Sequence, residues 1–184
     1  FLGSTFIYGF TTGSFFAILA VGSTVFSNDL GINSTGFGLI WSSMTILYAS
    51  AAFLSGNLST KIGLMSVMRI GMLLNLLSGV MFFTFIAIFG VTLFSIITPL
   101  VIMFFAHGFI VPTSMTKAVS DRPEIAGSSS GLSSALGLVT GGLFSILSGA
   151  VYAGSFLPIS FIVMASTIMC SLSYSLIKWG EKSN

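Results

Sequence analysis

The sequence predicts an all-α integral membrane protein with six transmembrane helices. Formally charged residues make up only 5% of the 184 residues, six Lys or Arg and four Asp or Glu, whereas 54% are hydrophobic. The mean hydropathy is +1.07. Because about a quarter of a soluble domain is charged, this chain has too little polar surface to face water. A soluble enzyme is therefore excluded, and the net charge of +2 without a basic cluster argues against nucleic acid as a partner.

The positions of the charged residues determine the number of predicted helices. The uncharged stretch between Arg69 and Lys117 would extend roughly 70 Å as one helix, so it must fold back within the membrane, and Gly90 is the expected turn. The long final uncharged block breaks in the same way at Ala153-Gly154-Ser155. No alternation of polar and apolar residues supports a β-barrel. The predicted helices cover 4–26, 37–57, 66–89, 91–114, 127–152 and 155–177.

Six helices place every cationic side chain on one side of the membrane. The cations are Lys61, Arg69, Lys117, Arg122, Lys178 and Lys182. The positive-inside rule makes that side cytoplasmic. We therefore expect a multi-pass protein of the cell (inner) membrane with both termini in the cytoplasm.

The second and fifth predicted helices each carry small residues at spacings of three and four. Such residues let helix backbones approach closely in lipid. One interpretation is static helix packing, and the other is a sliding interface between two parts that rock against each other. The candidate rocking-interface residues are Gly38, Ser42, Thr45 and Ala49 in the second helix and Gly137, Gly141 and Gly142 in the fifth.

The first and fourth predicted helices carry aromatic, Met and hydroxyl side chains that suit a cavity for bulky, weakly polar ligands. The candidate cavity residues are Tyr8, Thr12, Phe15, Phe16, Leu19, Met103, Phe104 and His107. Core packing or lipid contact is the alternative for each, because the chain contains 19 Phe. His107 either has a substrate- or proton-handling role or is a neutral, hydrogen-bonded structural element.

Several kinds of chemistry have no basis in this sequence. Asp29, Asp121, Glu124 and Glu181 all lie outside the predicted helices, so this chain alone supplies no carboxylate relay for protons. His, Cys and carboxylate residues are not clustered, and the lone Cys170 lies in an apolar run. We therefore expect no catalytic residues, no metal site and no cofactor, and a protein that is not an enzyme.

Three motifs resemble the C-terminal half of major facilitator superfamily transporters, most closely the drug:proton antiporters of the Bcr/CflA type. The first is the segment from Gly56 through Lys61 to Gly63, which is similar to the glycine-bounded basic loop of that family. The second is Gly108-Phe-Ile-Val-Pro112 together with Pro123-Glu-Ile-Ala126-Gly127-Ser128, and the third is Gly31-Ile-Asn-Ser34-Thr-Gly36-Phe37-Gly38.

The resemblance implies one six-helix domain, 1–184, built from two inverted three-helix repeats, 1–89 and 90–184. It implies that the first and fourth helices line a central cavity, that the second and fifth rock against a partner, and that Gly56, Lys61 and Gly63 form a gating loop. The implied function is export of amphipathic, drug-like small molecules by alternating access.

Three interpretations of the whole chain remain open. In the first, the chain is half of a secondary transporter, and a missing N-terminal half carries the proton-coupling carboxylate; Phe1 in place of Met agrees with this. In the second, a six-helix protein pairs with a second copy of itself. In the third, the chain is a membrane scaffold that transports nothing. The substrate is a drug or, alternatively, a sugar or another metabolite, and the lipid bilayer is a partner in every case.

Overall fold

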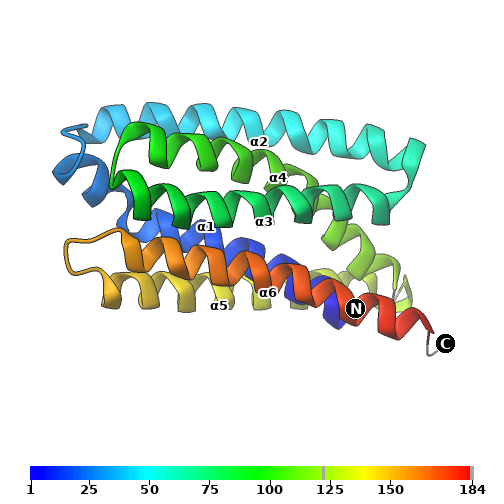
Figure 1. The fold of residues 1–184 in the computed structure, drawn as a ribbon. Helices are drawn as coiled ribbons and strands as arrows, with labels where there is room; N and C mark the ends of the chain where they lie inside the picture. Colours follow the sequence, from blue (N-terminus) through cyan, green and yellow to red (C-terminus); the bar gives the residue numbers. More distant parts are fainter. Residues whose placement is uncertain (122, 183–184) are drawn as a thin grey trace.

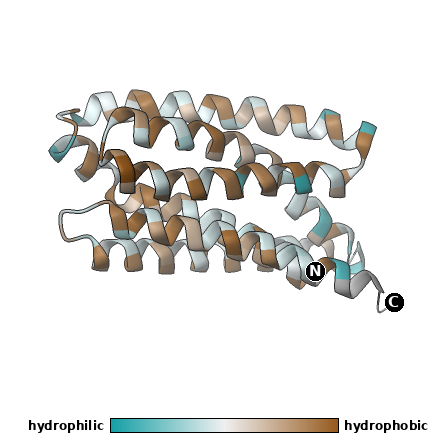
Figure 2. Cartoon of the chain, in the orientation of Figure 1, coloured by the Kyte–Doolittle hydropathy of each residue, from teal (hydrophilic) through white to brown (hydrophobic). Residues whose placement is uncertain are grey.

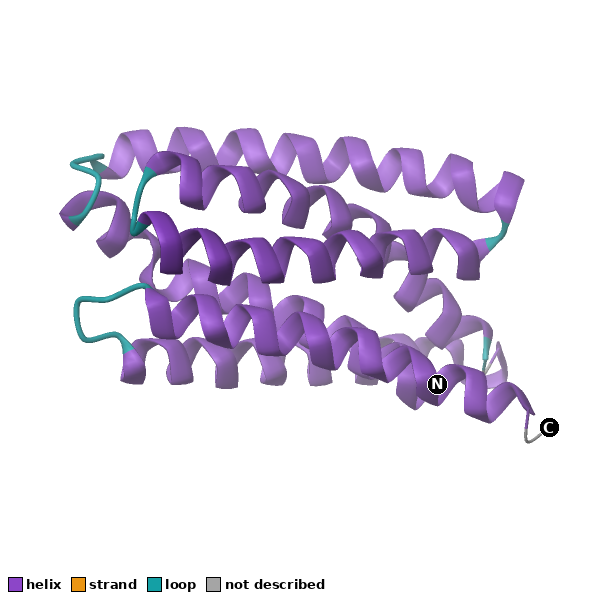
Figure 3. Cartoon of the chain, viewed as in Figure 1, coloured by secondary structure: helices purple, strands orange, loops and turns teal. Residues whose placement is uncertain are grey.

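Six long helices make up the chain in the computed structural model, which describes residues 1–121 and 123–182 (Figures 1 and 3). They are α1 (Leu2–Asn28), α2 (Ser34–Ile62), α3 (Leu64–Phe89), α4 (Leu93–Ser120), α5 (Ala126–Val151) and α6 (Leu157–Lys182), with a short 3-10 helix (Pro123–Ile125) before α5. Each long helix is long and apolar enough to cross a membrane. The prediction of an all-helical membrane protein is confirmed.

The helices extend further than the predicted spans at the end of the bundle that carries the cations. α2 continues to Ile62 instead of ending at 57, and α4 continues to Ser120 instead of 114. Hydropathy marks only the part of a helix that lies in hydrocarbon, whereas backbone hydrogen bonds continue beyond it. Gly56 and Lys61 are consequently helical residues and not loop residues, which corrects the expected gating loop. Gly63, with φ of +86°, is the single residue between α2 and α3.

The turn between α3 and α4 lies at Gly90, as the sequence predicts. Gly90 has φ of +67°, a left-handed conformation that suits glycine. Thr92 then caps α4: the Ser95 backbone N–H donates to Thr92 Oγ1 at 3.1 Å, and the Thr92 N–H donates to Ser95 Oγ at 2.9 Å. This reciprocal cap lets α4 begin at Leu93, three residues after the turn at Gly90.

The helices are arranged as two groups of three. α2, α3 and α4 lie on one side of the bundle, and α1, α5 and α6 lie on the other (Figure 1). α1 packs against α5 and α6, α4 packs against α2 and α3, and the two groups meet where α1 contacts α4 and α3 contacts α6. α1 and α4 are consequently the most buried helices, and α2 and α5 are the most exposed.

The most hydrophilic residues lie mainly toward the ends of the bundle, and brown and pale residues make up most of the middle (Figure 2). Lys61, Arg69, Lys117 and Lys178 all belong to the end of the bundle at which α1 begins. Asp29 follows α1 at the opposite end. Arg122, which the sequence analysis assigned to the cationic side, lies outside the described residues.

The closest approach between α1 and α5 depends on two buried glycines of α5. A Cβ atom at Gly141 would lie 2.7 Å from Cδ2 of Phe16, and a Cβ atom at Gly137 would collide with the ring of Tyr8. Lipid gives helices no hydrophobic reason to associate, so close packing of this kind supplies much of the attraction. Gly137 and Gly141 thus pack inside this chain, which corrects their assignment to an interface with a separate part.

We expect Gly141→Ala and Gly142→Ala to change stability in opposite directions. In Gly141→Ala the new methyl group meets the ring of Phe16, and overpacking of this kind costs about 1–3 kcal/mol. In Gly142→Ala the new methyl group meets nothing within 4 Å, so the higher helix propensity of Ala stabilises the protein by up to about 1 kcal/mol. Thermal unfolding in detergent measures both variants. Equal effects of the two variants would contradict the described α1–α5 packing.

Candidate functional site

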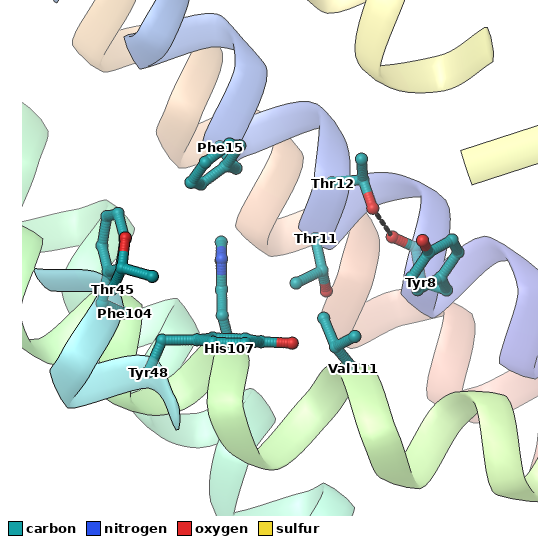
Figure 4. A pocket seen from close by; sticks show the side chains of 9 residues that line it. All are labelled: Tyr8, Thr11, Thr12, Phe15, Thr45, Tyr48, Phe104, His107 and Val111. Carbon is teal, nitrogen blue, oxygen red and sulfur yellow. Dashed lines mark hydrogen bonds between the residues drawn. The ribbon is translucent and has the colours of Figure 1, made fainter. Parts of the chain in front are cut away.

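A cavity of about 290 Å³ lies between α1, α2 and α4. Side chains from the three helices converge on it near the middle of each helix (Figure 4). They are Tyr8, Thr11, Thr12 and Phe15 from α1, Thr45 and Tyr48 from α2, and Phe104, His107 and Val111 from α4. The volume is just below the usual range for small-molecule pockets, and the lining is mainly apolar with a few polar groups, as such pockets require.

Aromatic rings form one wall of the cavity. The rings of Phe15, Trp41 and Phe104 contact one another, with centroid distances of 5.7 Å, 5.6 Å and 5.4 Å. Phe37 continues the cluster from Trp41 at 5.2 Å, and Phe26 continues it from Phe37 at 5.3 Å. These residues lie toward the end of the bundle where α1 ends and α2 begins. The aromatic cluster therefore packs the bundle between the cavity and that end.

The hydroxyl groups of the cavity fall into two kinds. Thr11, Thr12 and Thr45 donate their protons to carbonyls one turn earlier in their own helices, at 2.8–2.9 Å, so their oxygens remain only as acceptors. No hydrogen bond within the described residues engages the phenol of Tyr8 or of Tyr48. The two phenols are therefore the donors that a bound molecule would meet.

His107 connects the cavity to a buried polar group on α3. Its Nε2 atom lies 3.2 Å from Oδ1 of Asn75 and 3.4 Å from Oγ of Ser14. All three side chains are buried, and His107 also lines the cavity. His107 thus has the hydrogen-bonded environment expected of a structural residue and the cavity position expected of a residue that handles substrate or protons. Sequence analysis did not select Asn75, although it is the only amide side chain in α3 and lies inside an apolar span.

The charged groups lie away from the cavity. Lys117 Nζ is 2.8 Å from Oδ1 of Asp121, just beyond the end of α4, and the amino group of Phe1 is 2.7 Å from Oδ2. Burial raises the pKa of Asp121, but the hydrogen bonds and positive charges of Lys117 and Phe1 outweigh it, so the pKa lies below its ordinary value. Among the residues that the structure describes, no charged side chain lines the cavity.

Five of the eight candidate cavity residues line the cavity, and three do not. Tyr8, Thr12, Phe15, Phe104 and His107 are those that do. Met103 is completely buried in the hydrophobic core, Phe16 packs toward Gly141 of α5, and Leu19 is not part of the lining. Adjacent helix residues point about 100° apart, and here the rotation of α1 and α4 turns Phe15 and Phe104 toward the cavity while Phe16 and Met103 face other neighbours.

Two residues of α2 belong to the cavity although the sequence did not predict them there. Thr45 was a rocking-interface candidate and Tyr48 was not a candidate for any site, but both line the cavity. Thr11 and Val111 complete the lining. The other candidates on α2, namely Gly38, Ser42 and Ala49, are exposed, as is Gly142 of α5.

The fold and the cavity together define a multi-pass helical membrane protein with a mainly apolar cavity between three of its helices. No protein-family model matches the chain. It is similar to a bicyclomycin resistance protein homolog of Haemophilus influenzae, with 23% identity over 173 residues that cover 94% of this chain. The chain spans 43% of the length of that relative. This distant similarity agrees with the family resemblance of the motifs.

We expect Phe104→Ala to destabilise the protein because Phe104 is nearly fully buried between Phe15 and Trp41. The loss should be about 2–3 kcal/mol, below that of a water-soluble core because unfolded helices also meet apolar lipid. Thermal unfolding in detergent measures it. Phe53→Ala is the control, because Phe53 is 74% exposed on α2 and should change stability little. A comparable loss in the control would contradict the role of the aromatic cluster.

Proposed function

We propose that this chain is half of a secondary active transporter that exports amphipathic, drug-like small molecules by alternating access. The observation that carries the proposal is the cavity near the middle of three membrane-spanning helices, walled by aromatic rings and hydroxyls. The similarity to a protein named for bicyclomycin resistance supports export of a drug over uptake of a sugar or another metabolite. The bound molecule is uncharged where it meets this half, because the lining carries rings, phenols and one imidazole but no ion.

The proposed half-transporter consists of two three-helix repeats, 1–89 and 90–184. The two repeats pack in the same pattern when α1 is matched with α4, α2 with α5 and α3 with α6. The packing of α1 against α5 and α6 then corresponds to the packing of α4 against α2 and α3. The α1–α4 contact and the α3–α6 contact each join two matched helices, so the matching leaves both contacts unchanged. Because three is an odd number and successive helices alternate in direction, the two repeats cross the membrane in opposite senses.

A second helical bundle completes the transporter in this proposal. The exposed small residues of α2, namely Gly38, Ser42 and Ala49, leave a face on which another helix could pack closely. The relative is more than twice as long as the matched segment, which favours six further helices of the same polypeptide over a second copy of this chain. The proton-coupling carboxylate belongs to that other half, since Asp29 and Asp121 lie just beyond the ends of α1 and α4 and Glu124 lies in the short 3-10 helix before α5, far from the cavity lining.

The orientation follows from the cations. Lys61, Arg69, Lys117 and Lys178 belong to one end of the bundle, and the positive-inside rule assigns this end, with both termini, to the cytoplasm. The aromatic cluster of Phe15, Trp41 and Phe104 then lies on the outer side of the cavity. The proposed location is the cell (inner) membrane.

Transport by the full-length protein tests the proposal through the two phenols. The gene is expressed in drug-sensitive cells, and the inhibitory concentration of bicyclomycin is measured together with its accumulation. We expect Tyr8→Phe combined with Tyr48→Phe to weaken export roughly tenfold, because two neutral hydrogen bonds are worth about 1.4 kcal/mol together. The control is Tyr152→Phe, since Tyr152 follows α5 at the far end of the bundle. Export that is absent in the wild type would overturn the proposed function and leave the scaffold interpretation.

His107 variants separate hydrogen bonding from proton handling. We expect His107→Gln to retain most of the export, because its amide can replace the hydrogen bond that Nε2 makes to Asn75, whereas His107→Ala loses most of it. Drug efflux from loaded proteoliposomes under an imposed pH gradient measures both variants. Equal loss in the two variants, with normal protein levels, would assign the proton-handling role to His107 instead.

A further inference from the structure

We propose that Arg69, Tyr174 and Lys178 form a binding site for the phosphodiester headgroup of an anionic phospholipid, at the outer surface of the α3–α6 pair. α3 and α6 pack against each other along the bundle (Figure 1). Arg69 belongs to the second turn of α3, and Tyr174 and Lys178 belong to the same end of the bundle, on α6. The site lies on helices that contribute nothing to the cavity lining, so it is independent of the proposed transport function.

One aromatic ring brings the two cations together. The guanidinium carbon of Arg69 lies 5.8 Å from the centre of the Tyr174 ring, and Nζ of Lys178 lies 5.4 Å from it. Arg69 also donates a hydrogen bond to the Tyr174 hydroxyl at 3.2 Å. Tyr174 is half-buried and packs against a core cluster that includes Met72 and Ile177. The core therefore holds the ring, and the ring holds both cations at the surface.

The arrangement lacks a counter-ion among the described side chains. The ion pairs of the described residues involve Asp121 and not Arg69 or Lys178, and both of these side chains are exposed. Two like charges on one ring repel each other unless an anion lies between them. A phosphate group carries the charge and the oxygen acceptors that a guanidinium and an ammonium recognise.

An apolar strip on α3 identifies the anion as part of a lipid. Leu73, Leu77 and Val80 follow Arg69 at spacings of four, four and three, so they lie on the same face of the helix. Their side chains are 62%, 49% and 40% exposed. The strip runs from the cationic end toward the middle of the bundle, as an acyl chain does below its headgroup. Free phosphate would use the cations but not the strip.

Binding of a fluorescent phosphatidylglycerol to the full-length protein in detergent tests the site. Phosphatidylcholine with the same acyl chains is the lipid control. We expect Arg69→Gln and Lys178→Gln each to weaken phosphatidylglycerol binding roughly fivefold, the effect of one cation near a membrane surface. Lys61→Gln is the matched control variant, because Lys61 is an exposed cation at the same end of the bundle but on α2.

The outcomes separate the lipid site from simpler explanations. Unchanged melting temperatures without added lipid show that the variants are folded. If Arg69→Gln is unstable, Lys178→Gln alone is enough to test the lipid site. Equal binding of the two lipids, or equal weakening by Lys61→Gln, would overturn the proposal in favour of general attraction. Displacement by inorganic phosphate alone, with Leu73→Ser without effect, would overturn it in favour of a free-anion site. Absence of drug export by a wild-type protein that still binds phosphatidylglycerol selectively would contradict only the proposed function.

Discussion

The absence of hydrogen-bonding partners in hydrocarbon is the constraint on which this structure depends. Each backbone must satisfy its own polar groups there, and helices do so within a single segment. Many of the polar side chains follow the same rule. The hydroxyls of Thr11, Thr12 and Thr45 donate to carbonyls one turn earlier, and the one buried imidazole lies within hydrogen-bonding distance of Asn75 and Ser14. Charges remain at the ends of the bundle for the same reason, so the cavity between α1, α2 and α4 is uncharged.

Close packing replaces the hydrophobic effect as the force that arranges these helices. Gly137 and Gly141 of α5 accept Tyr8 and Phe16 of α1, and Gly79 of α3 lies against Thr167 of α6. Tyr8 has a further role, because its side chain packs on Gly137 and also lines the cavity. The shape of the cavity is therefore coupled to the α1–α5 contact. A change in that contact would move a phenol that the proposed ligand meets.

The two proposals use different surfaces of the same bundle. The proposed transport site lies between α1, α2 and α4, where uncharged rings and hydroxyls converge. The proposed lipid site lies on α3 and α6, where exposed cations share the Tyr174 ring. This division follows the packing pattern: α1 and α4 are enclosed by the other helices, whereas α3 and α6 present an apolar outer face to lipid.

The sequence by itself determined the number of helices, the turn at Gly90 and the cationic end of the bundle. These features depend on one dimension, since hydrocarbon thickness limits the length of an uncharged stretch and charge is excluded from it. The tertiary structure alone decided which side chains meet. Phe15 and Phe104 reached the cavity while Phe16 and Met103 did not, Gly141 turned toward α1, and Asn75 joined His107 from 32 residues away. Neighbouring helix residues point about 100° apart, so the rotation of each helix against its partners selects among them, and that rotation is a property of the packed bundle.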